Sequence, residues 1–249
     1  MKQINNELYN DLGDAWWHAE DHMITFLRHE SAIKVDFILK HCPAKKSLNI
    51  LDLGSGAGLI TLPLAQAGHR LTAVDLSEPA LKQLQAKAHS LGIENNIQTI
   101  QANACKEVEK LSPTEKFDLV LAMDVLEHVE NPQALIQTAQ KYLRPGGVFI
   151  YHTLNKNWLC WLVYLQIAPR LIKHCPPHLH LYHYMIKPKQ MTQWLSELGF
   201  QSSVPVGIHP PILQRGMGEL LFTRAIKTPL HFKYCKSTTF GYLASAILN

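Results

Sequence analysis

The stretch Asn49-Ile-Leu-Asp-Leu-Gly-Ser-Gly-Ala-Gly-Leu-Ile-Thr61 decides the fold of this 249-residue chain. An apolar run leads into three glycines on alternate positions, Gly54, Gly56 and Gly58, and apolar residues then resume at helical spacing. This order predicts a strand, a tight turn and a helix. Glycine adopts the dihedral angles of such a turn at low cost and lets the backbone approach a ligand. The free N–H groups at the start of the following helix favour an electron-rich ligand at the turn.

Two aspartates near this turn narrow the choice of ligand. Asp75 ends a second apolar run, 71–75, where a carboxylate can accept hydrogen bonds from a ribose. Asp52 lies two residues before the first glycine, where its charge would repel a pyrophosphate and attract a cationic amino-acid tail. The pattern Asp-x-Gly-x-Gly-x-Gly therefore favours S-adenosylmethionine over NAD. Because the chain has no GxxxxGK[ST] motif, a P-loop is excluded.

Composition is typical of a globular protein. The chain is 47% hydrophobic and 18% charged, and its net charge of +4 is too small and diffuse to indicate nucleic acid, although it is compatible with an anionic membrane surface. Five cysteines, an odd number without a CxxC pair, predict reduced thiols in a cytoplasmic protein. The N-terminus has no apolar signal core, and no apolar run approaches the roughly 20 residues needed to span a bilayer.

Periodicity predicts a single domain, 1–249, in four segments. These are a helical N-terminal cap (1–46), a core of alternating strands and helices (48–153), an apolar lid insertion (154–186), and a C-terminal helix with strands (187–249). Alternating elements with short connections predict an α/β fold with a mostly parallel sheet. The expected strands are 49–53, 71–75, 97–101, 117–122, 147–153, 200–208 and 239–247, and the expected helices are 59–67, 78–91, 104–111, 132–143 and 187–199.

Three features of the cap and the insertion each allow two interpretations. Trp16 and Trp17 could be core residues or a lid over a ligand. The apolar stretch 158–168 could be an inserted core helix, or it could be functional, as a substrate lid or as an interfacial helix that contacts a membrane through 158–174. The pattern His178-x-His180-x-x-His183 favours a histidine-rich lid contacting substrate over a zinc site, because no fourth ligand lies nearby.

The core resembles the class I S-adenosylmethionine-dependent methyltransferases. The resemblance covers 48–153 and is carried by the glycine turn with Asp75, by Phe117-Asp-Leu-Val, and by Leu143-Arg-Pro-Gly-Gly147. It implies a Rossmann-like fold, with a mostly parallel seven-stranded sheet that has helices on both faces.

A narrower resemblance extends over most of the chain, to the ubiquinone-biosynthesis O-methyltransferases. It is carried by Trp16-Trp17, Met123-Asp-Val-Leu-Glu-His-Val129, Thr153-Leu-Asn-Lys-Asn157, Ile186-Lys-Pro188 and Gly207-Ile-His209. Members of this family methylate polyprenylated catechol or phenol rings at the membrane surface. The stretch 212–231 has little likeness to the family.

Carried over by position, the resemblance implies a set of cofactor residues. Lys34 stands where the family usually has Arg, and Asn103 stands where methyltransferases commonly have Asp near the adenine. The full set expected to bind S-adenosylmethionine is Lys34, Asp52, Gly54, Gly56, Gly58, Asp75, Leu76, Asn103, Ala104 and Met123.

Three residues after the fourth expected strand allow three interpretations. In a helical turn, Asp124, Glu127 and His128 would share one face. They could hold a divalent metal such as Mg²⁺, which would bind a catechol and lower its pKa. Without a metal, His128 could be the general base for the phenolic proton. The trio could also only position the neighbouring cofactor residue.

The sequence predicts an S-adenosylmethionine-dependent O-methyltransferase acting on a phenolic hydroxyl of a polyprenyl-benzenoid ubiquinone precursor. Two alternatives stay open: the same fold acting on another small lipophilic molecule, and a non-catalytic cofactor-binding scaffold in a membrane-associated biosynthetic complex. We expect a small lipophilic aromatic substrate, no nucleic acid, and a cytoplasmic protein that could be peripheral on the inner face of a membrane.

Overall fold

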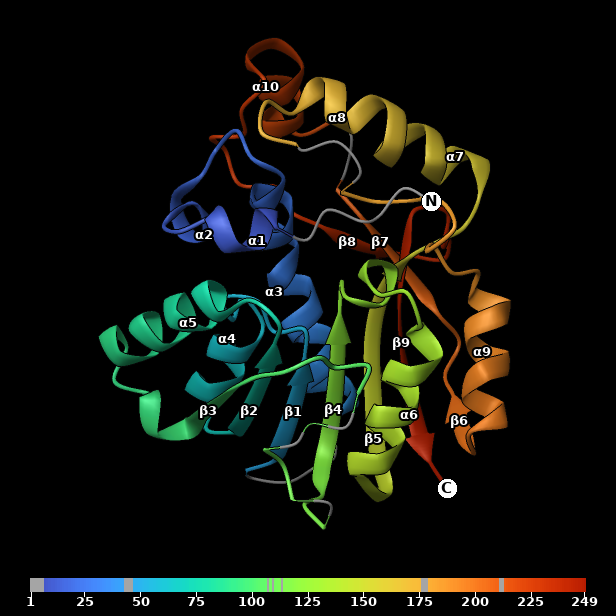
Figure 1. Cartoon of the computed structure of the whole chain (residues 1–249). Helices are drawn as coiled ribbons and strands as arrows, with labels where there is room; N and C mark the ends of the chain where they lie inside the picture. Colours follow the sequence, from blue (N-terminus) through green and yellow to red (C-terminus); the bar gives the residue numbers. More distant parts are fainter. Residues whose placement is uncertain are drawn as a thin grey trace.

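A computed structural model describes residues 7–42, 47–106, 108, 110–112, 114–175, 179–210 and 213–249. In these residues nine strands form one sheet in the order β3-β2-β1-β4-β5-β9-β7-β8, with β6 also paired to β9 (Figure 1). The strands are β1 (Asn49–Leu53), β2 (Arg70–Asp75), β3 (Ile97–Gln101), β4 (Phe117–Met123), β5 (Leu143–Leu154), β6 (Phe200–Ser202), β7 (Val206–His209), β8 (Lys233–Cys235) and β9 (Gly241–Leu248).

The sheet confirms the predicted α/β fold but has more strands than the seven expected. β1 to β5 pair with one another in parallel, whereas the pairs β5–β9, β6–β9, β7–β9 and β7–β8 are antiparallel. The expected strand 200–208 is divided into β6 and β7, which pair with different parts of β9. Pro205 lies in the interruption, and proline has no N–H to donate to a ladder. β8 adds an edge strand that the sequence did not indicate.

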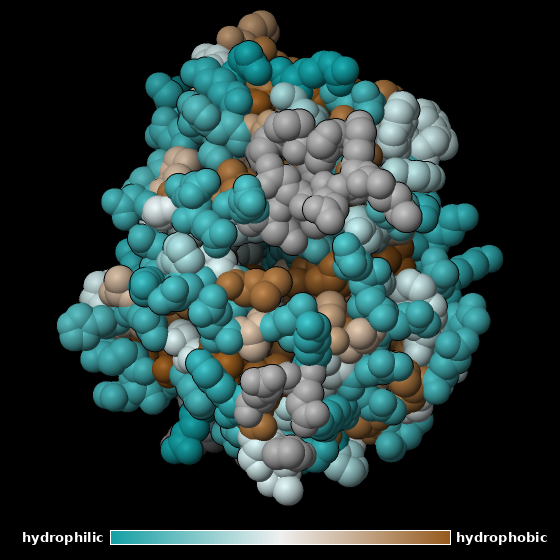
Figure 2. All heavy atoms as spheres, viewed as in Figure 1, coloured by the Kyte–Doolittle hydropathy of each residue, from teal (hydrophilic) through white to brown (hydrophobic). Residues whose placement is uncertain are grey.

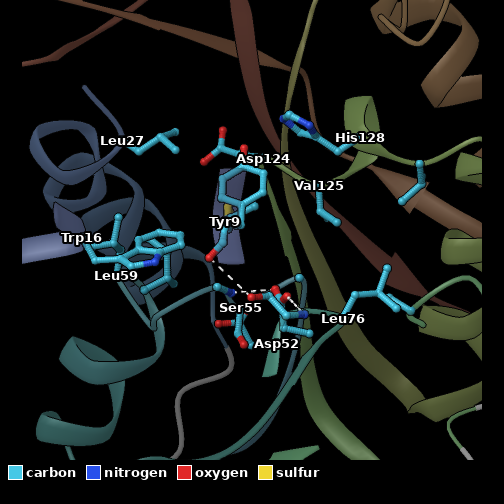
Figure 3. A pocket seen from close by; sticks show the side chains of 18 of the residues that line it. Tyr9, Trp16, Leu27, Asp52, Ser55, Leu59, Leu76, Asp124, Val125 and His128 are labelled. Carbon is cyan, nitrogen blue, oxygen red and sulfur yellow. Dashed lines mark hydrogen bonds between the residues drawn. The ribbon is translucent and has the colours of Figure 1, made fainter. Parts of the chain in front are cut away.

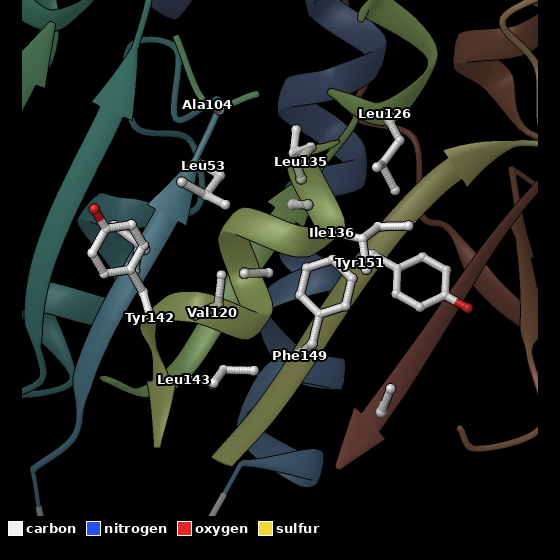
Figure 4. Close-up of a cluster of buried hydrophobic side chains, with 14 of the residues drawn as sticks. Leu53, Ala104, Val120, Leu126, Leu135, Ile136, Tyr142, Leu143, Phe149 and Tyr151 are labelled. Carbon is white, nitrogen blue, oxygen red and sulfur yellow. The ribbon is translucent and has the colours of Figure 1, made fainter. Parts of the chain in front are cut away.

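Helices cover both faces of the sheet. Eight α-helices lie outside the insertion in the described residues. They are α1 (Leu8–Asp11), α2 (Ala15–His18), α3 (Met23–His41), α4 (Thr61–Gln66), α5 (Glu78–Ser90), α6 (Pro132–Tyr142), α9 (Pro188–Glu197) and α10 (Arg215–Thr223). α3 and α4 pack on one face, and α6 and α9 pack on the other, where Figure 4 shows Leu135 and Ile136 of α6 against Val120, Phe149 and Tyr151.

The central strand β4 shows why both faces are covered. Each of its residues, Phe117 to Met123, is buried, and successive side chains enter opposite hydrophobic clusters: Val120 and Ala122 on one face, Leu119 and Leu121 on the other. A strand buried on both faces reads as a continuous apolar run, which is why its position was predictable.

Three segments far apart in sequence form a roof beyond the carboxyl ends of the parallel strands, at the top of Figure 1. They are the cap, the insertion and the region of α10. The insertion is one continuous helix whose middle is π-helical: α7 (Trp158–Cys160), the π-helix Trp161–Ile167 and α8 (Ala168–Leu171). Ile172 of the insertion and Leu220 of α10 belong to one buried hydrophobic cluster, and Phe26 of α3 packs against this cluster. The N–H of Ile226 donates to the carbonyl of Glu20 at 2.7 Å, which joins the C-terminal region to the cap.

One expected helix differs from the structure. The described residues of 104–111 contain turns and bends but no helix. Helix α10 falls in the stretch without family likeness and was missed.

Candidate active site

The glycine turn forms the floor of a cavity of about 290 Å³, which we call the glycine-turn cavity. Nine of the ten predicted cofactor residues line it: Lys34, Asp52, Gly54, Gly56, Asp75, Leu76, Asn103, Ala104 and Met123. Lys34 comes from α3, and the others come from the carboxyl ends of neighbouring strands or from the loops that follow these strands. In a parallel sheet these ends all lie at one edge.

Gly58, the tenth residue, does not line this cavity. A Cβ at Gly58 would lie 2.8 Å from the Leu84 side chain, so the missing side chain lets α5 approach the turn. At Gly56 a Cβ would lie 2.8 Å from the Trp16 ring. Both residues also have a positive φ, +53° at Gly56 and +89° at Gly58, so the turn needs glycine at each position.

Trp16 combines the two roles predicted for the tryptophan pair, a core residue and a lid over a ligand. Its ring is buried against Leu12, Ile24 and Ala57, and it also lines the glycine-turn cavity. Trp16 is thus both a core residue and a cover over the turn. Trp17 is half-buried at the edge of the same cluster, where the Lys87 ammonium lies 5.5 Å from its ring centroid.

Two carboxylates give this cavity an acidic floor. Asp75 accepts hydrogen bonds from the N–H groups of Gly56 and Ser77, both at 2.8 Å, and burial raises its pKa despite these bonds. Asp52 accepts a hydrogen bond from the Thr61 hydroxyl at 2.6 Å, and burial raises the pKa of Asp52 to about 6. A cavity with these acids suits a ligand that carries hydroxyl groups and positive charge.

A second cavity of about 340 Å³, the apolar cavity, lies under the roof. The cap, the π-helix, α10 and the C-terminal segment contribute to its walls. Its apolar lining includes Leu8, Leu12, Met23, Phe26, Val163, Tyr164, Ile167, Leu171, Met217, Leu220, Phe232 and Phe240. A band of hydrophobic residues is visible across the middle of the face in Figure 2.

The two cavities meet at Tyr9, Leu27, Asp124 and His128, which line both. In Figure 3, Asp124 and His128 lie on the side of the glycine-turn cavity opposite Asp52. The Tyr9 ring contacts the His128 ring edge-on, with centroids 5.8 Å apart. A molecule in the apolar cavity can therefore meet a molecule in the glycine-turn cavity beside these side chains.

A buried network of charged side chains surrounds Asp124. The Lys34 ammonium lies 2.5 Å from Asp124 Oδ2 and 2.7 Å from Glu30 Oε2, and His152 Nδ1 bonds to Asp124 Oδ1. Burial alone would raise the pKa of Asp124, but Lys34 and His152 outweigh it and hold this pKa well below its usual range. Asp124 has φ +55°, a strained conformation that aspartate tolerates better than most residues and that occurs often at functional sites.

His152 and Glu30 were missed in the sequence. His152 directly follows the apolar run 148–151 of β5, and this was the available signal. Glu30 lies one turn before Lys34 in α3, and nothing in its helical pattern distinguishes it from a solvent-facing acid.

Two histidines of the apolar cavity are neutral imidazoles. Burial lowers the pKa of His128 to about 4 and that of His180 to about 3, and the two ring centroids are 5.0 Å apart. His180 comes from the predicted histidine-rich lid and lines the apolar cavity. His183 instead packs against Tyr184, and His178 lies outside the described residues.

The predicted metal trio is not gathered as a ligand set. Within the described part of the chain, the group of His, Cys, Asp and Glu side chains close enough to hold a metal is Glu30, Asp124 and His152, with ligand atoms within 4.8 Å of one another. Glu127 turns away and accepts a hydrogen bond from the Thr153 hydroxyl at 2.8 Å. Glu127 and His128 belong to the 3₁₀ turn Leu126–His128, whereas Asp124 precedes that turn in a left-handed conformation, so the three residues do not share one helical face as predicted.

Comparison with known proteins identifies the family. The family described as "Methyltransferase domain" matches residues 23–202. The chain belongs to the S-adenosylmethionine-dependent methyltransferases. It is 30% identical to the ubiquinone biosynthesis O-methyltransferase of Hydrogenovibrio crunogenus over 86% of each chain, and 29% identical to that of Coxiella burnetii over 81% of this chain and 83% of the other.

Solved structures support the same fold. Magnesium protoporphyrin IX methyltransferase from Synechocystis PCC 6803, with bound SAH, superposes with a TM-score of 0.66 at 18% identity and covers 98% of this methyltransferase and 97% of that chain. A SAM-dependent methyltransferase from Aquifex aeolicus gives a TM-score of 0.61 at 13% identity, covering 99% and 100%. Within the described residues, no helix combines the length and the apolarity that crossing a membrane requires.

S-Adenosylmethionine fits the glycine-turn cavity chemically. Its ribose hydroxyls can donate to a carboxylate such as Asp75, and its sulfonium and amino groups suit the charges of Asp52 and Asp124. Asn103 lines the cavity with an amide that can bond an adenine amino group.

Replacing Asp75 with alanine should weaken S-adenosylmethionine binding by about 1–3 kcal/mol, the cost of an unsatisfied polar pair. The Kd, measured by calorimetry, should rise roughly 5- to 150-fold. Glu78→Ala is the matched control, because Glu78 is exposed at the start of α5 and does not line the cavity. An unchanged Kd for Asp75→Ala would remove Asp75 from the ribose site.

Replacing Glu127 with glutamine should change how stability depends on pH. Burial and Asp124 raise the pKa of Glu127 to about 7, from a usual value of 4.5. A carboxyl with a raised pKa stabilises the fold below its unfolded pKa, and this contribution is lost as pH rises through the folded pKa. The wild type therefore loses roughly 3 kcal/mol of unfolding free energy between pH 4 and pH 8 that Glu127→Gln does not lose. The difference in unfolding free energy, variant minus wild type, should rise by this amount over the same range.

Urea unfolding at a series of pH values measures this difference. Glu130→Gln, at an exposed position, is the control and should show little change across the same range. A constant difference for Glu127→Gln would mean that Glu127 is ionised throughout.

Proposed function

We propose that this methyltransferase transfers a methyl group to a phenolic oxygen of a lipophilic aromatic acceptor, a polyprenyl-benzenoid ubiquinone precursor. One observation carries the proposal: the apolar cavity and the glycine-turn cavity share His128 and Asp124 in their linings. The names of the relatives from Hydrogenovibrio crunogenus and Coxiella burnetii support this substrate class.

When bound, S-adenosylmethionine supplies an electrophilic methyl group. The chain itself holds the ribose at Asp75, orients the acceptor ring below the roof, and excludes water, because positioning is the main contribution in such a displacement. His128, a neutral imidazole above about pH 4, accepts the phenolic proton. Burial makes His128 a weak base, but a phenolate formed beside the imidazolium, with Asp124 nearby, would stabilise the transferred proton.

Mg²⁺ at Asp124, Glu127 and His128, the predicted alternative to His128 as a metal-free base, is disfavoured, because these three side chains are not gathered as a ligand set and Asp124 is already paired with Lys34. Carboxylate and imidazole donors closer together would suit a divalent ion. Activity before and after treatment with EDTA distinguishes the two: loss that Mg²⁺ restores supports the metal, and retained activity supports the base.

The proposed acceptor can be tested by measuring whether methyl transfer requires a prenyl tail on the aromatic ring. Methyl transfer from labelled S-adenosylmethionine is measured with a catechol that carries one isoprenyl unit and with catechol alone. Burial of five carbons at about 0.8 kcal/mol each leads us to expect kcat/KM at least about 10-fold higher for the tailed compound. Equal values would contradict a polyprenyl acceptor, and no transfer to either, with cofactor bound, would favour a different acceptor.

A different lipophilic acceptor is the second candidate, and one observation favours it. Met217 and Leu220 of α10 and the neighbouring Phe232 line the apolar cavity, although α10 lies where the family likeness is lost. A scaffold without catalysis is disfavoured, because Asp52, the glycine turn and Asp75 all retain the chemistry that cofactor binding needs.

We also propose that the protein is cytoplasmic and contacts the inner face of a membrane through the insertion. Trp158, Trp161 and Ile167 of the insertion are exposed by 71%, 40% and 41%, and basic residues follow within 158–174. Co-sedimentation with vesicles containing anionic lipid tests this contact. Trp158→Ser/Trp161→Ser should reduce the bound fraction, and equal binding would exclude this surface. A biosynthetic complex is a further candidate partner.

A further inference from the structure

Lys34 is a buried cation at the junction of the two cavities. It is 1% exposed, yet its ammonium reaches two carboxylates, Glu30 Oε2 at 2.7 Å and Asp124 Oδ2 at 2.5 Å. Lys34 lines the glycine-turn cavity, Glu30 lines the apolar cavity, and Asp124 lines both. A lysine is seldom this deeply buried unless it is paired, and here the pairing is double.

The groups around the ammonium form a metal-ligand set. Glu30, Asp124 and His152 present ligand atoms within 4.8 Å of one another, and His152 Nδ1 is bonded to the second oxygen of Asp124. Two carboxylates and an imidazole are donors that Mn²⁺, Co²⁺ and Zn²⁺ accept. The Lys34 ammonium already contacts two of these three side chains.

We propose that the Lys34 ammonium is the resident cation of this site and occupies the position that a divalent metal ion would otherwise take between Glu30, Asp124 and His152. The site would then be a latent metal site that the lysine keeps closed. A single positive charge held at this place would compensate the two carboxylates and keep Asp124 oriented between cofactor and acceptor. The inference concerns the cation alone and does not depend on which acceptor is methylated.

Removing the side chain should open the site. Lys34→Ala leaves two carboxylates, a histidine and an empty volume, and it should bind about one equivalent of Mn²⁺ at least about 100-fold more tightly than the wild type. Lys34→Met is the matched control, because it also removes the charge but fills the volume with an uncharged chain of similar length. Mn²⁺ is the probe because it prefers oxygen and nitrogen donors over the thiolates that five cysteines could offer.

Electron paramagnetic resonance measures the concentration of unbound Mn²⁺ directly. This readout does not depend on methyl transfer. Tight binding to Lys34→Ala, weakened by the further change His152→Phe, is the expected result. Tight binding to the wild type would overturn the proposal, as would absence of tight binding to a folded Lys34→Ala.

If Lys34→Ala does not fold, measurements on the wild type still test the proposal. The wild type, dialysed against EDTA, should bind S-adenosylmethionine with an unchanged Kd and should show no tight Mn²⁺ site. A Kd that rises after EDTA and recovers with Mn²⁺ would contradict a resident ammonium. Because both readouts omit the acceptor, failure here is distinct from failure of the proposed substrate.

Discussion

Replacing His128 with glutamine should lower kcat for methyl transfer by about 10²- to 10⁴-fold, the range that a positioned general base contributes. His128 lies where the two cavities meet, and its imidazole is neutral above about pH 4. Glutamine keeps hydrogen-bonding capacity and approximate size but cannot accept the phenolic proton. Single-turnover assays with labelled S-adenosylmethionine and the tailed catechol measure the methyl-transfer step.

Cofactor affinity separates a chemical role for His128 from a structural one. The Kd for S-adenosylmethionine should change little in His128→Gln, because the lost function is proton transfer. His89→Gln is the control, since the His89 side chain is 82% exposed at the end of α5. Activity within a few-fold of the wild type would mean that the phenol loses its proton elsewhere.

Replacing Lys34 with methionine should lower the free energy of unfolding by roughly 3–5 kcal/mol, the usual cost of breaking a buried ion pair. The methionine fills most of the volume, but Glu30 and Asp124 lose the cation that both contact. Burial lowers the pKa of Lys34, whereas Asp124 and Glu30 raise it more strongly, so the net shift is upward and the ammonium stays charged in the fold. Chemical unfolding at neutral pH measures the loss.

An exposed lysine provides the matched control. Lys40 is in the same helix and forms the same kind of i, i+4 pair, with Asp36, but its side chain is 61% exposed. Lys40→Met should therefore cost at most about 0.5 kcal/mol. If Lys34→Met cost as little, the network around Asp124 would not be holding its charges in a low-dielectric environment. Adding Asp124→Asn to Lys34→Met should recover part of the loss.

The class of fold was predictable because its signals are local. The glycine turn, the buried run of β4 and the helix α5 each depend on neighbours in sequence, so periodicity located them to within a few residues. Nine of the ten residues predicted to bind the cofactor line one cavity, for a related reason. In a parallel sheet, the residues that follow the strands all meet at one edge, whatever the details of packing. Two outcomes differ from the expectation. Gly58 packs against Leu84 and does not line the cavity, and the expected strand 200–208 is interrupted near Pro205, which adds to the seven strands expected.

The chemistry at the junction of the cavities was decided by tertiary structure. Asp124 and His128 are close in sequence, yet the partners that set the ionisation of Asp124 are Lys34 and His152, from α3 and β5. The roof likewise unites the cap, the insertion and α10, whose patterns individually allow a core helix, a lid or a surface helix. By itself the sequence determined the reaction class and the cofactor, because those depend on a local turn and the order of strands. Only the tertiary structure decided which side chains share a cavity. Desolvation and ion pairing at Asp124 depend on His152 and Lys34, which lie 28 and 90 residues away in the chain.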